Sequence, residues 1–160
     1  MTVELEDWQL EALGDAGAPL LPPGRWALTA AELHRLAVEA FPESRTRRDL
    51  WDRFKRTRTV LRHVAREIWV GGSFVSTKLN PKDIDLLALL WSDRLHVPRH
   101  VKREHYMYAV GPALGVDLTA KFDDDATGLD SWQRWIQYGK PYLRTAKTPG
   151  RGVAIVPIAD

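Results

Sequence analysis

The chain has 160 residues, of which 23 are basic and 21 acidic, and it contains no cysteine. The absence of cysteine excludes disulfides, thiolate zinc sites and a cysteine nucleophile, and a net charge of +2 is too small to require a nucleic-acid partner. This length fits one domain. We expect that domain to span residues 1–160, with an extended lead over residues 1–28 and the core over residues 29–158.

The N-terminal residues and the apolar runs favour a cytoplasmic protein. Residues 1–7 are acidic and lack the basic and apolar regions of a secretory signal. No apolar run has the length of a membrane span, and the longest lies near residues 84–91. We therefore expect a soluble cytoplasmic protein without a membrane partner.

Two helices are predicted before the first long strand. Thr29 begins a capping-box pattern that predicts a helix over residues 29–41, and Pro42 ends this helix. Ser44 is expected to cap a longer helix over residues 44–67. Its apolar residues recur at helical spacing and predict a buried stripe of Leu50, Phe54, Leu61, Val64 and Ile68.

The opposite face of this second helix is basic. It carries Arg48, Lys55, Arg58, Arg62 and Arg66. Such a face is usually solvated, and contact with RNA or with an acidic protein is the alternative.

Residues 68–90 hold the most informative pattern of the chain. They predict a buried strand, a glycine-serine turn, a short loop and a second apolar strand that opens with Asp83 and Asp85. Because successive side chains of a strand point to opposite faces, we expect these two aspartates to project from the same side. Two carboxylates placed in this way can share a cation.

The turn that precedes the two acids suits a phosphate. Gly71 and Gly72 leave the backbone free of Cβ crowding, so its N–H groups and the Ser73 hydroxyl can approach a phosphate closely. Asn80 and Pro81 limit any helix after this turn to about one turn. A phosphate on one side and a metal on the other indicate phosphoryl or nucleotidyl transfer.

The remaining segments complete the pattern of an α/β protein. In chain order they predict a helix over residues 99–114, a strand over 116–122, a helix over 129–137, an irregular basic segment over 139–152 and a strand over 152–158. Pro157 favours an edge position for this last strand, because proline cannot donate a hydrogen bond to a ladder. We expect a small mixed β-sheet of about four or five strands, with helices mainly on one face and the metal site at an open edge.

The order of these features resembles the nucleotidyltransferases of the DNA polymerase β superfamily. In this chain it consists of Gly72 and Ser73, a spacer of nine residues, the Asp83–Asp85 segment in an apolar strand and a lone Asp117 in a later strand. Over roughly residues 20–158 the chain looks like a group of small bacterial nucleotidyltransferase-like proteins. Some small members of this kind resemble the antitoxin half of toxin-antitoxin pairs.

The resemblance implies a nucleotidyltransferase fold, a site and a function. Its site residues are Gly71, Gly72, Ser73 and Lys78 for nucleotide binding, and Asp83, Asp85 and Asp117 as catalytic residues and metal ligands. Two magnesium ions are the expected cofactors, with manganese as the alternative. The implied reaction moves a nucleoside monophosphate from a nucleoside triphosphate to a hydroxyl group on a protein or an RNA. A toxin protein, with this chain as its antitoxin, or a transfer RNA would supply that hydroxyl.

Some alternatives accompany this interpretation. A protein of the same fold that only binds and neutralises a partner protein would keep these residues without catalysis. Asp117 is preferred as the third carboxylate over residues 123–125, because it lies between apolar residues in a strand. Trp132 and Trp135 suit either base stacking or core packing, and core packing is favoured. No zinc site is expected at the three histidines of residues 96–105.

Overall fold

The computed structural model describes residues 18–138 and 151–159 of the chain. Within them a five-stranded sheet has the order β1-β5-β2-β3-β4. Its strands are β1 (Arg25–Ala27), β2 (Ala65–Gly71), β3 (Asp85–Leu90), β4 (Asp117–Phe122) and β5 (Val153–Pro157). β2 pairs antiparallel with both β3 and β5, whereas β1 pairs parallel with β5 and β3 pairs parallel with β4. The sheet is therefore mixed, which confirms the predicted α/β class.

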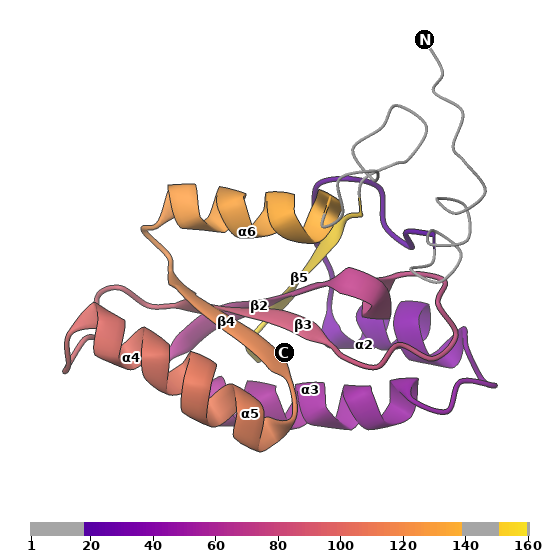
Figure 1. Ribbon diagram of the computed structural model, residues 1–160, viewed down its shortest axis with the longest axis horizontal. Helices are drawn as coiled ribbons and strands as arrows, with labels where there is room; N and C mark the ends of the chain where they lie inside the picture. Colours follow the sequence, from indigo (N-terminus) through magenta and orange to yellow (C-terminus); the bar gives the residue numbers. More distant parts are fainter. Residues whose placement is uncertain (1–17, 139–150, 160) are drawn as a thin grey trace, which may run out of the picture.

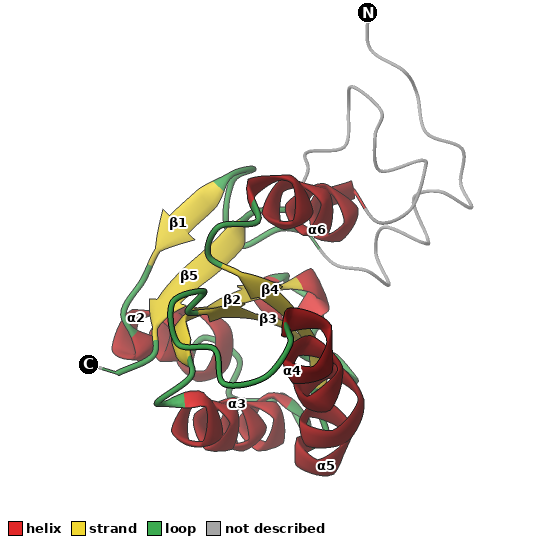
Figure 2. Ribbon diagram, turned by 90° about the vertical axis from the view of Figure 1, so that its left-hand side faces the viewer, coloured by secondary structure: helices red, strands yellow, loops and turns green. Residues whose placement is uncertain are grey.

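Helices cover both faces of the sheet, but unequally (Figure 1, Figure 2). The described helical segments are α2 (Ala30–His34), η1 (Arg35–Glu39), α3 (Arg47–Leu61), η2 (Gly72–Val75), α4 (Arg99–His105), η3 (Tyr106–Val110), α5 (Gly111–Leu114) and α6 (Ala126–Tyr138). α2, α3 and the continuous α4-η3-α5 segment lie on one face, and α6 lies on the other. The expectation of helices mainly on one face is confirmed. None of the described helices has both the length and the apolar character needed to cross a membrane.

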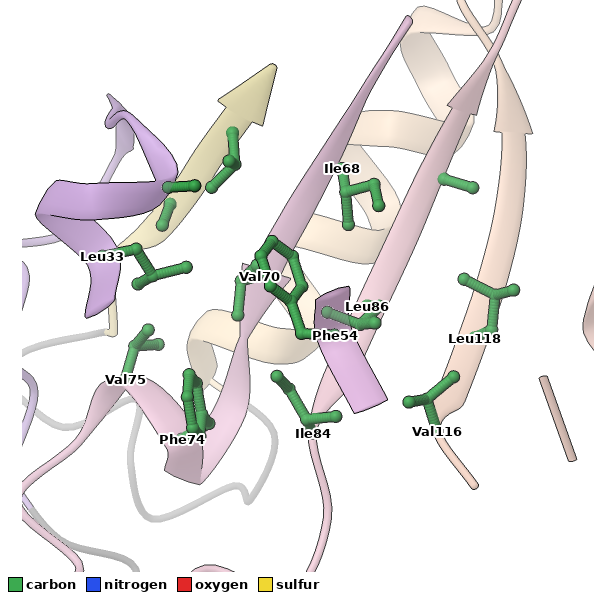
Figure 3. Close-up of a cluster of buried hydrophobic side chains, with 14 of the residues drawn as sticks. Leu33, Phe54, Ile68, Val70, Phe74, Val75, Ile84, Leu86, Val116 and Leu118 are labelled. Atoms are coloured by element: carbon green, nitrogen blue, oxygen red, sulfur yellow. The ribbon is translucent and has the colours of Figure 1, made fainter. Parts of the chain in front are cut away.

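Each face of the sheet packs its own apolar cluster. Since strand side chains alternate between faces, Val70 and Leu86 join the larger cluster with Phe54 of α3, as Figure 3 shows. Their neighbours Trp69 and Leu87 join the smaller cluster beneath α6. This alternation fixes which side chains of β2, β3 and β4 face α6.

The first predicted helix begins as expected. Thr29 Oγ1 accepts a hydrogen bond from the Glu32 N–H at 3.1 Å, and Glu32 Oε1 accepts one from the Thr29 N–H at 3.1 Å, which confirms the capping box. After α2 the helix continues as the π-helical segment η1, in which the Ala40 N–H bonds to the carbonyl of Arg35, five residues earlier.

The second predicted helix is shorter than expected. α3 ends at Leu61 and β2 begins at Ala65, so the predicted end of this helix is wrong. Val64 lies in the turn between them, and Ile68 lies in the strand. Both fit helical spacing because a buried strand that directly follows an amphipathic helix extends its apolar pattern. Tertiary pairing decides the boundary, since Ala65 pairs with Leu90 at the far end of β3.

Two predictions near the chain ends also need correction. Residues 18–28 of the expected extended lead include the strand β1, and residues 1–17 lie outside the described part of the chain. The last strand lies between β1 and β2, so its predicted edge position is wrong. β1 pairs only with Val153–Ile155, so Pro157 occupies a stretch of β5 that has one neighbouring strand, as at an edge. Most of the predicted irregular segment, residues 139–150, also lies outside the described residues.

Candidate functional site

Three site residues form a row across the sheet. In the strand register, Gly71 at the end of β2 pairs with Asp85, and Asp85 pairs with Asp117. By strand alternation Asp85 lies on the same face as Leu87, which packs beneath α6. The two aspartates are the first residues of the parallel strands β3 and β4, so their carboxyl groups emerge side by side at one end of the sheet.

Asp85 and Asp117 interact directly through a hydrogen bond between their carboxyl groups. Asp85 is half-buried, whereas Asp117 and Asp83 are exposed. The pKa of Asp85 is raised to about 7, and burial is the largest cause. The hydrogen bond with Asp117 and the charges of Asp117 and Asp83 also raise this pKa, whereas the charge of Arg151 lowers it. A carboxyl group in this position is stabilised by a proton or by a cation between the two acids.

Asp83 lies just before β3 and not in it. The strand begins at Asp85, so the predicted placement of both acids in one strand is wrong. The reason is that Gly71 is the last residue of β2 and the chain turns away at Gly72, which leaves Asp83 without a ladder partner. Its charge nevertheless raises the pKa of Asp85, so the acid is near enough to contribute to the site.

The two glycines of the turn are required by their surroundings. Gly72 has a φ of +73°, and a Cβ at this position would overlap Oδ2 of Asp85. A Cβ at Gly71 would overlap Cγ2 of Ile136 and lie 3.5 Å from the ring of Trp132. The turn therefore brings bare backbone against the carboxyl group of Asp85 on one side and against α6 on the other.

Ser73 and Lys78 lie in the loop that follows these glycines. The four residues of η2 form a 3-10 turn, as the prediction of about one helical turn requires. Ser73 is half-buried, and its carbonyl accepts hydrogen bonds from the N–H and the hydroxyl of Ser76 at 3.2 and 2.6 Å. In the described part of the chain the Ser73 hydroxyl itself has no hydrogen-bond partner, so it is open to a ligand. Lys78 is also half-buried.

A buried arginine holds this loop in place. Arg47, the first residue of α3, has no exposed surface, and its guanidinium donates hydrogen bonds to four backbone carbonyls. Three of them belong to the loop: Phe74 at 2.6 Å, Ser76 at 2.6 Å and Lys78 at 2.5 Å. The fourth is Ala37 at 2.9 Å. Because buried carbonyls need a donor, this side chain supplies what a neighbouring strand would otherwise provide.

The π-helical turn of η1 explains why the carbonyl of Ala37 can accept from Arg47. In an α-helix this carbonyl would bond to the Phe41 N–H. Here the Phe41 N–H bonds to the carbonyl of Val38 at 3.0 Å instead. The Phe41 ring lies 3.9 Å from the guanidinium carbon of Arg47. Burial lowers the pKa of Arg47 to about 10, so the group stays charged at neutral pH.

Two further contacts fasten the loop from other sides. The Leu20 N–H donates a hydrogen bond to the carbonyl of Val75 at 3.0 Å. The side chain of Asn80 accepts one from the Arg45 N–H at 2.7 Å, just before α3. The loop is thus held by the N-terminal segment, by η1 and by the start of α3, which suits a site that must keep its shape.

Arg151 belongs to the site although its sequence context gives little sign of it. Its positive charge acts on Asp85 and lowers that residue's pKa. It stands just before β5, which pairs antiparallel with β2, so the residues before β5 lie beside the turn that ends β2. The signal that could have identified it is the pairing of β5 with β2, which a sequence alone does not reveal.

α6 covers the site from above the sheet. It begins at Ala126, earlier than predicted, because the Asp125 side chain accepts the Gly128 N–H at 3.0 Å and so caps the first turn. Trp132 is buried against the sheet, which confirms core packing for this residue. Trp135 is 56% exposed and does not take part in the core.

The other acids considered for the site lie elsewhere. Asp123 accepts a backbone hydrogen bond, Asp124 forms a two-bond ion pair with Arg99 at 2.6 and 2.7 Å, and Asp125 caps α6. All three follow the C-terminal end of β4, whereas Asp117 begins that strand beside Asp85. The geometry therefore agrees with Asp117 as the partner of Asp85.

The described residues offer a metal ion two adjacent carboxylates and no complete cage of protein ligands. Within residues 18–138 and 151–159, no group of three or more histidine, aspartate or glutamate residues is arranged to hold a metal. Asp85 and Asp117 still offer hard oxygen ligands, and their repulsion is the kind that a divalent cation relieves. Magnesium commonly completes its shell with water and substrate phosphates, so two adjacent carboxylates fit that ion.

Comparisons with known proteins add a family but no activity. The model of a family of unknown function, DUF6932, matches residues 15–145. No curated protein and no solved structure matches the chain.

Proposed function

We propose that this chain, which belongs to the family of unknown function DUF6932, is a metal-dependent nucleotidyltransferase. It would move a nucleoside monophosphate from a nucleoside triphosphate to a hydroxyl group. The single observation that carries the proposal is the hydrogen-bonded pair Asp85 and Asp117, set against the bare backbone of Gly72. A half-buried carboxylate beside a second one is unfavourable for folding, and a cation that neutralises the pair would remove this cost.

The residues of the turn suit the phosphate end of a nucleotide. Gly72 keeps the backbone of the turn close to the carboxyl group of Asp85, and the Ser73 hydroxyl beside it can donate to a phosphate oxygen. Arg151 would add a guanidinium, whose planar donors match phosphate oxygens. Arg47 would act as a positioning residue, because it fixes the loop and touches no substrate.

The proposed reaction is an in-line displacement at the α-phosphate. The oxygen of the acceptor hydroxyl forms a bond to the α-phosphorus, and the bond from that phosphorus to the bridging oxygen of the β-phosphate breaks. Pyrophosphate leaves with the electron pair, and the hydroxyl proton passes to the exposed carboxylate of Asp117. Magnesium held by Asp85 and Asp117 would supply charge neutralisation at the phosphates and acidify the attacking hydroxyl.

The acceptor is proposed to be a hydroxyl group on a protein or an RNA. Asp83 and Asp117 are exposed, so a large acceptor can reach the carboxylates. A toxin that this chain modifies as its antitoxin, or a transfer RNA end, is the class of partner that the resemblance suggests.

A non-catalytic module of the same fold is the second candidate. It is favoured by the absence, among the described residues, of a ready-made group of three metal ligands. In that case the fold would bind and neutralise a partner protein, and the carboxylates would serve no transfer.

One experiment separates the two candidates. The chain is incubated with magnesium and with nucleoside triphosphates labelled at the α-phosphate, alone and with the product of the neighbouring gene. Label transfer that is lost in Asp83→Ala/Asp85→Ala and kept in Asp93→Ala, an exposed acid beyond the other end of β3, supports the enzyme. If the double variant and the wild type bind the partner equally and neither transfers label, the non-catalytic candidate holds.

A further inference from the structure

A second cationic surface lies at the other end of the sheet. Trp91 directly follows β3, and its half-buried indole lies near two guanidinium groups. The guanidinium carbon of Arg94 is 4.7 Å from the centre of the ring, and that of Arg66 is 5.5 Å from it. Both arginines are exposed. A hydrogen bond of 3.1 Å from the backbone N–H of Trp91 to the carbonyl of Val64 joins the segment after β3 to the turn that precedes β2.

The charges of this surface are not neutralised. Arg62 precedes β2, Arg66 is the second residue of that strand, and Arg94 follows β3. None of the three guanidinium groups has a carboxylate partner among the described residues. Other arginines do have such partners, since ion pairs join Arg25 to Asp130, Arg53 to Asp49 and Arg99 to Asp124. The nearby acid Asp93 is exposed and forms no ion pair in the described part of the chain. An excess of positive charge therefore remains there.

The helix dipole of α3 explains the position of only one of these three arginines. Arg62 is the C-cap residue of α3, where a cation is favoured by the helix dipole. That reason does not apply to Arg66 in a strand or to Arg94 in a loop. Both could point freely into water, yet each lies near one tryptophan ring.

We propose that Arg62, Arg66, Trp91 and Arg94, here named the Trp91 surface, bind single-stranded RNA. Guanidinium groups pair with backbone phosphates, and their planes as well as the indole offer stacking for unpaired bases. An acidic protein would use the charges but has no need of the aromatic ring among them. The combination of flat cations and an indole therefore favours nucleic acid over an acidic protein.

The Trp91 surface is separate from the candidate active site. It lies past the end of β3, and Asp85 begins that strand, so the strand of six residues puts about 20 Å between them. In Figure 1 the loop between β3 and α4 lies at the end of the sheet opposite to η2. RNA binding here does not depend on nucleotidyl transfer.

Fluorescence anisotropy with a labelled ten-nucleotide uridine RNA tests the proposal. The titration uses the full chain in EDTA at several salt concentrations. We expect binding that weakens steeply with salt, and a dissociation constant at least about tenfold higher for Arg66→Gln/Arg94→Gln. The slope of log affinity against log salt should fall by about 0.7 for each phosphate contact removed. Arg66→Lys/Arg94→Lys keeps the charge, so it should keep the slope while losing affinity through poorer stacking.

Two controls make the result specific. Arg45→Gln/Arg48→Gln removes the same charge at the other end of α3 and should change the dissociation constant less than about twofold. Asp83→Ala/Asp85→Ala should bind the RNA like wild type, so the outcome is distinguishable from that of the transfer assay. The proposal is overturned if wild type fails to bind at 50 mM salt, if the Arg66 and Arg94 variants bind as wild type does, or if poly-glutamate competes as well as the RNA.

Discussion

Asp85 and Asp117 occupy paired positions in two parallel strands and share a hydrogen bond between their carboxyl groups. The register between β3 and β4 places the two acids on neighbouring strands at the same level, so the pairing of the strands sets the distance between them. Asp85 lies against the backbone of Gly72 as well. The raised pKa of Asp85 shows that the fold disfavours its charged form, which makes its removal informative.

Asp85→Asn is expected to stabilise the metal-free protein at alkaline pH. The pKa of Asp85 is about 7 in the folded chain against an ordinary value of 3.8, so the folded state holds this proton more tightly. The stability that results is fully present below pH 3.8 and is lost as the pH rises through about 7. In EDTA at pH 8 the variant should therefore exceed wild type by on the order of 1 kcal/mol, since it buries no charge.

Urea unfolding in EDTA at pH 5 and pH 8 measures this effect. The gain should be larger at pH 8 than at pH 5, and Asp93→Asn, which removes an exposed acid, should show no such dependence. An Asp85→Asn protein that is less stable than wild type at pH 8 would contradict the prediction.

Gly72→Ala is expected to destabilise the fold for two separable reasons. The positive φ costs about 1–2 kcal/mol for any residue with a Cβ, and the new methyl group would also overlap Asp85 Oδ2. In an Asp85→Ala background the overlap is absent, so the cost of Gly72→Ala should fall to the backbone part alone. A double-mutant cycle by urea unfolding measures this coupling. Equal costs in both backgrounds would show that the carboxyl group moves aside freely.

The acids and the turn of the candidate site could be selected from the sequence because most of them lie within a short stretch of local pattern. Asp83, Asp85 and the glycines are close in sequence, and Asp117 stands out as a charge in an apolar strand. What the sequence missed depends on pairing between distant segments. Arg151 joins the site because β5 inserts between β1 and β2, an arrangement that local periodicity does not encode.

The predicted ends of helices and strands were wrong for the same physical reason. The end of α3 was predicted too late because apolar spacing continues into β2, and only the pairing with β3 settles where the strand begins. The start of β3 was predicted too early because Asp83 has the right side-chain type but no partner strand. The four hydrogen bonds from Arg47 to backbone carbonyls could not be predicted either, because an arginine at the start of a helix is not marked in the sequence as buried.

Arg47→Met is expected to destabilise the protein by about 3 kcal/mol or more. The change leaves several buried carbonyls without a donor, and each such group costs about 1–3 kcal/mol. Its neighbour provides a matched control, since Arg48 is exposed and Arg48→Met should change stability by less than about 0.5 kcal/mol. Hydrogen exchange should become faster in residues 72–78 of Arg47→Met if the loop depends on this side chain. Unchanged exchange there would reject the positioning role.

Arg151→Gln is expected to weaken nucleotide binding while it leaves the fold intact. The proposed contact between a guanidinium and a phosphate is charge-assisted, and its loss should raise the dissociation constant for a non-hydrolysable nucleoside triphosphate about tenfold. Removing this positive charge also removes the influence that lowers the pKa of Asp85, so Asp85 should hold its proton to higher pH. Calorimetric titration with magnesium measures the affinity, and Arg48→Gln serves as the control of equal charge. If Arg151→Gln binds the nucleotide as wild type does, the phosphates lie elsewhere and the turn at Gly72 must be reconsidered as their site.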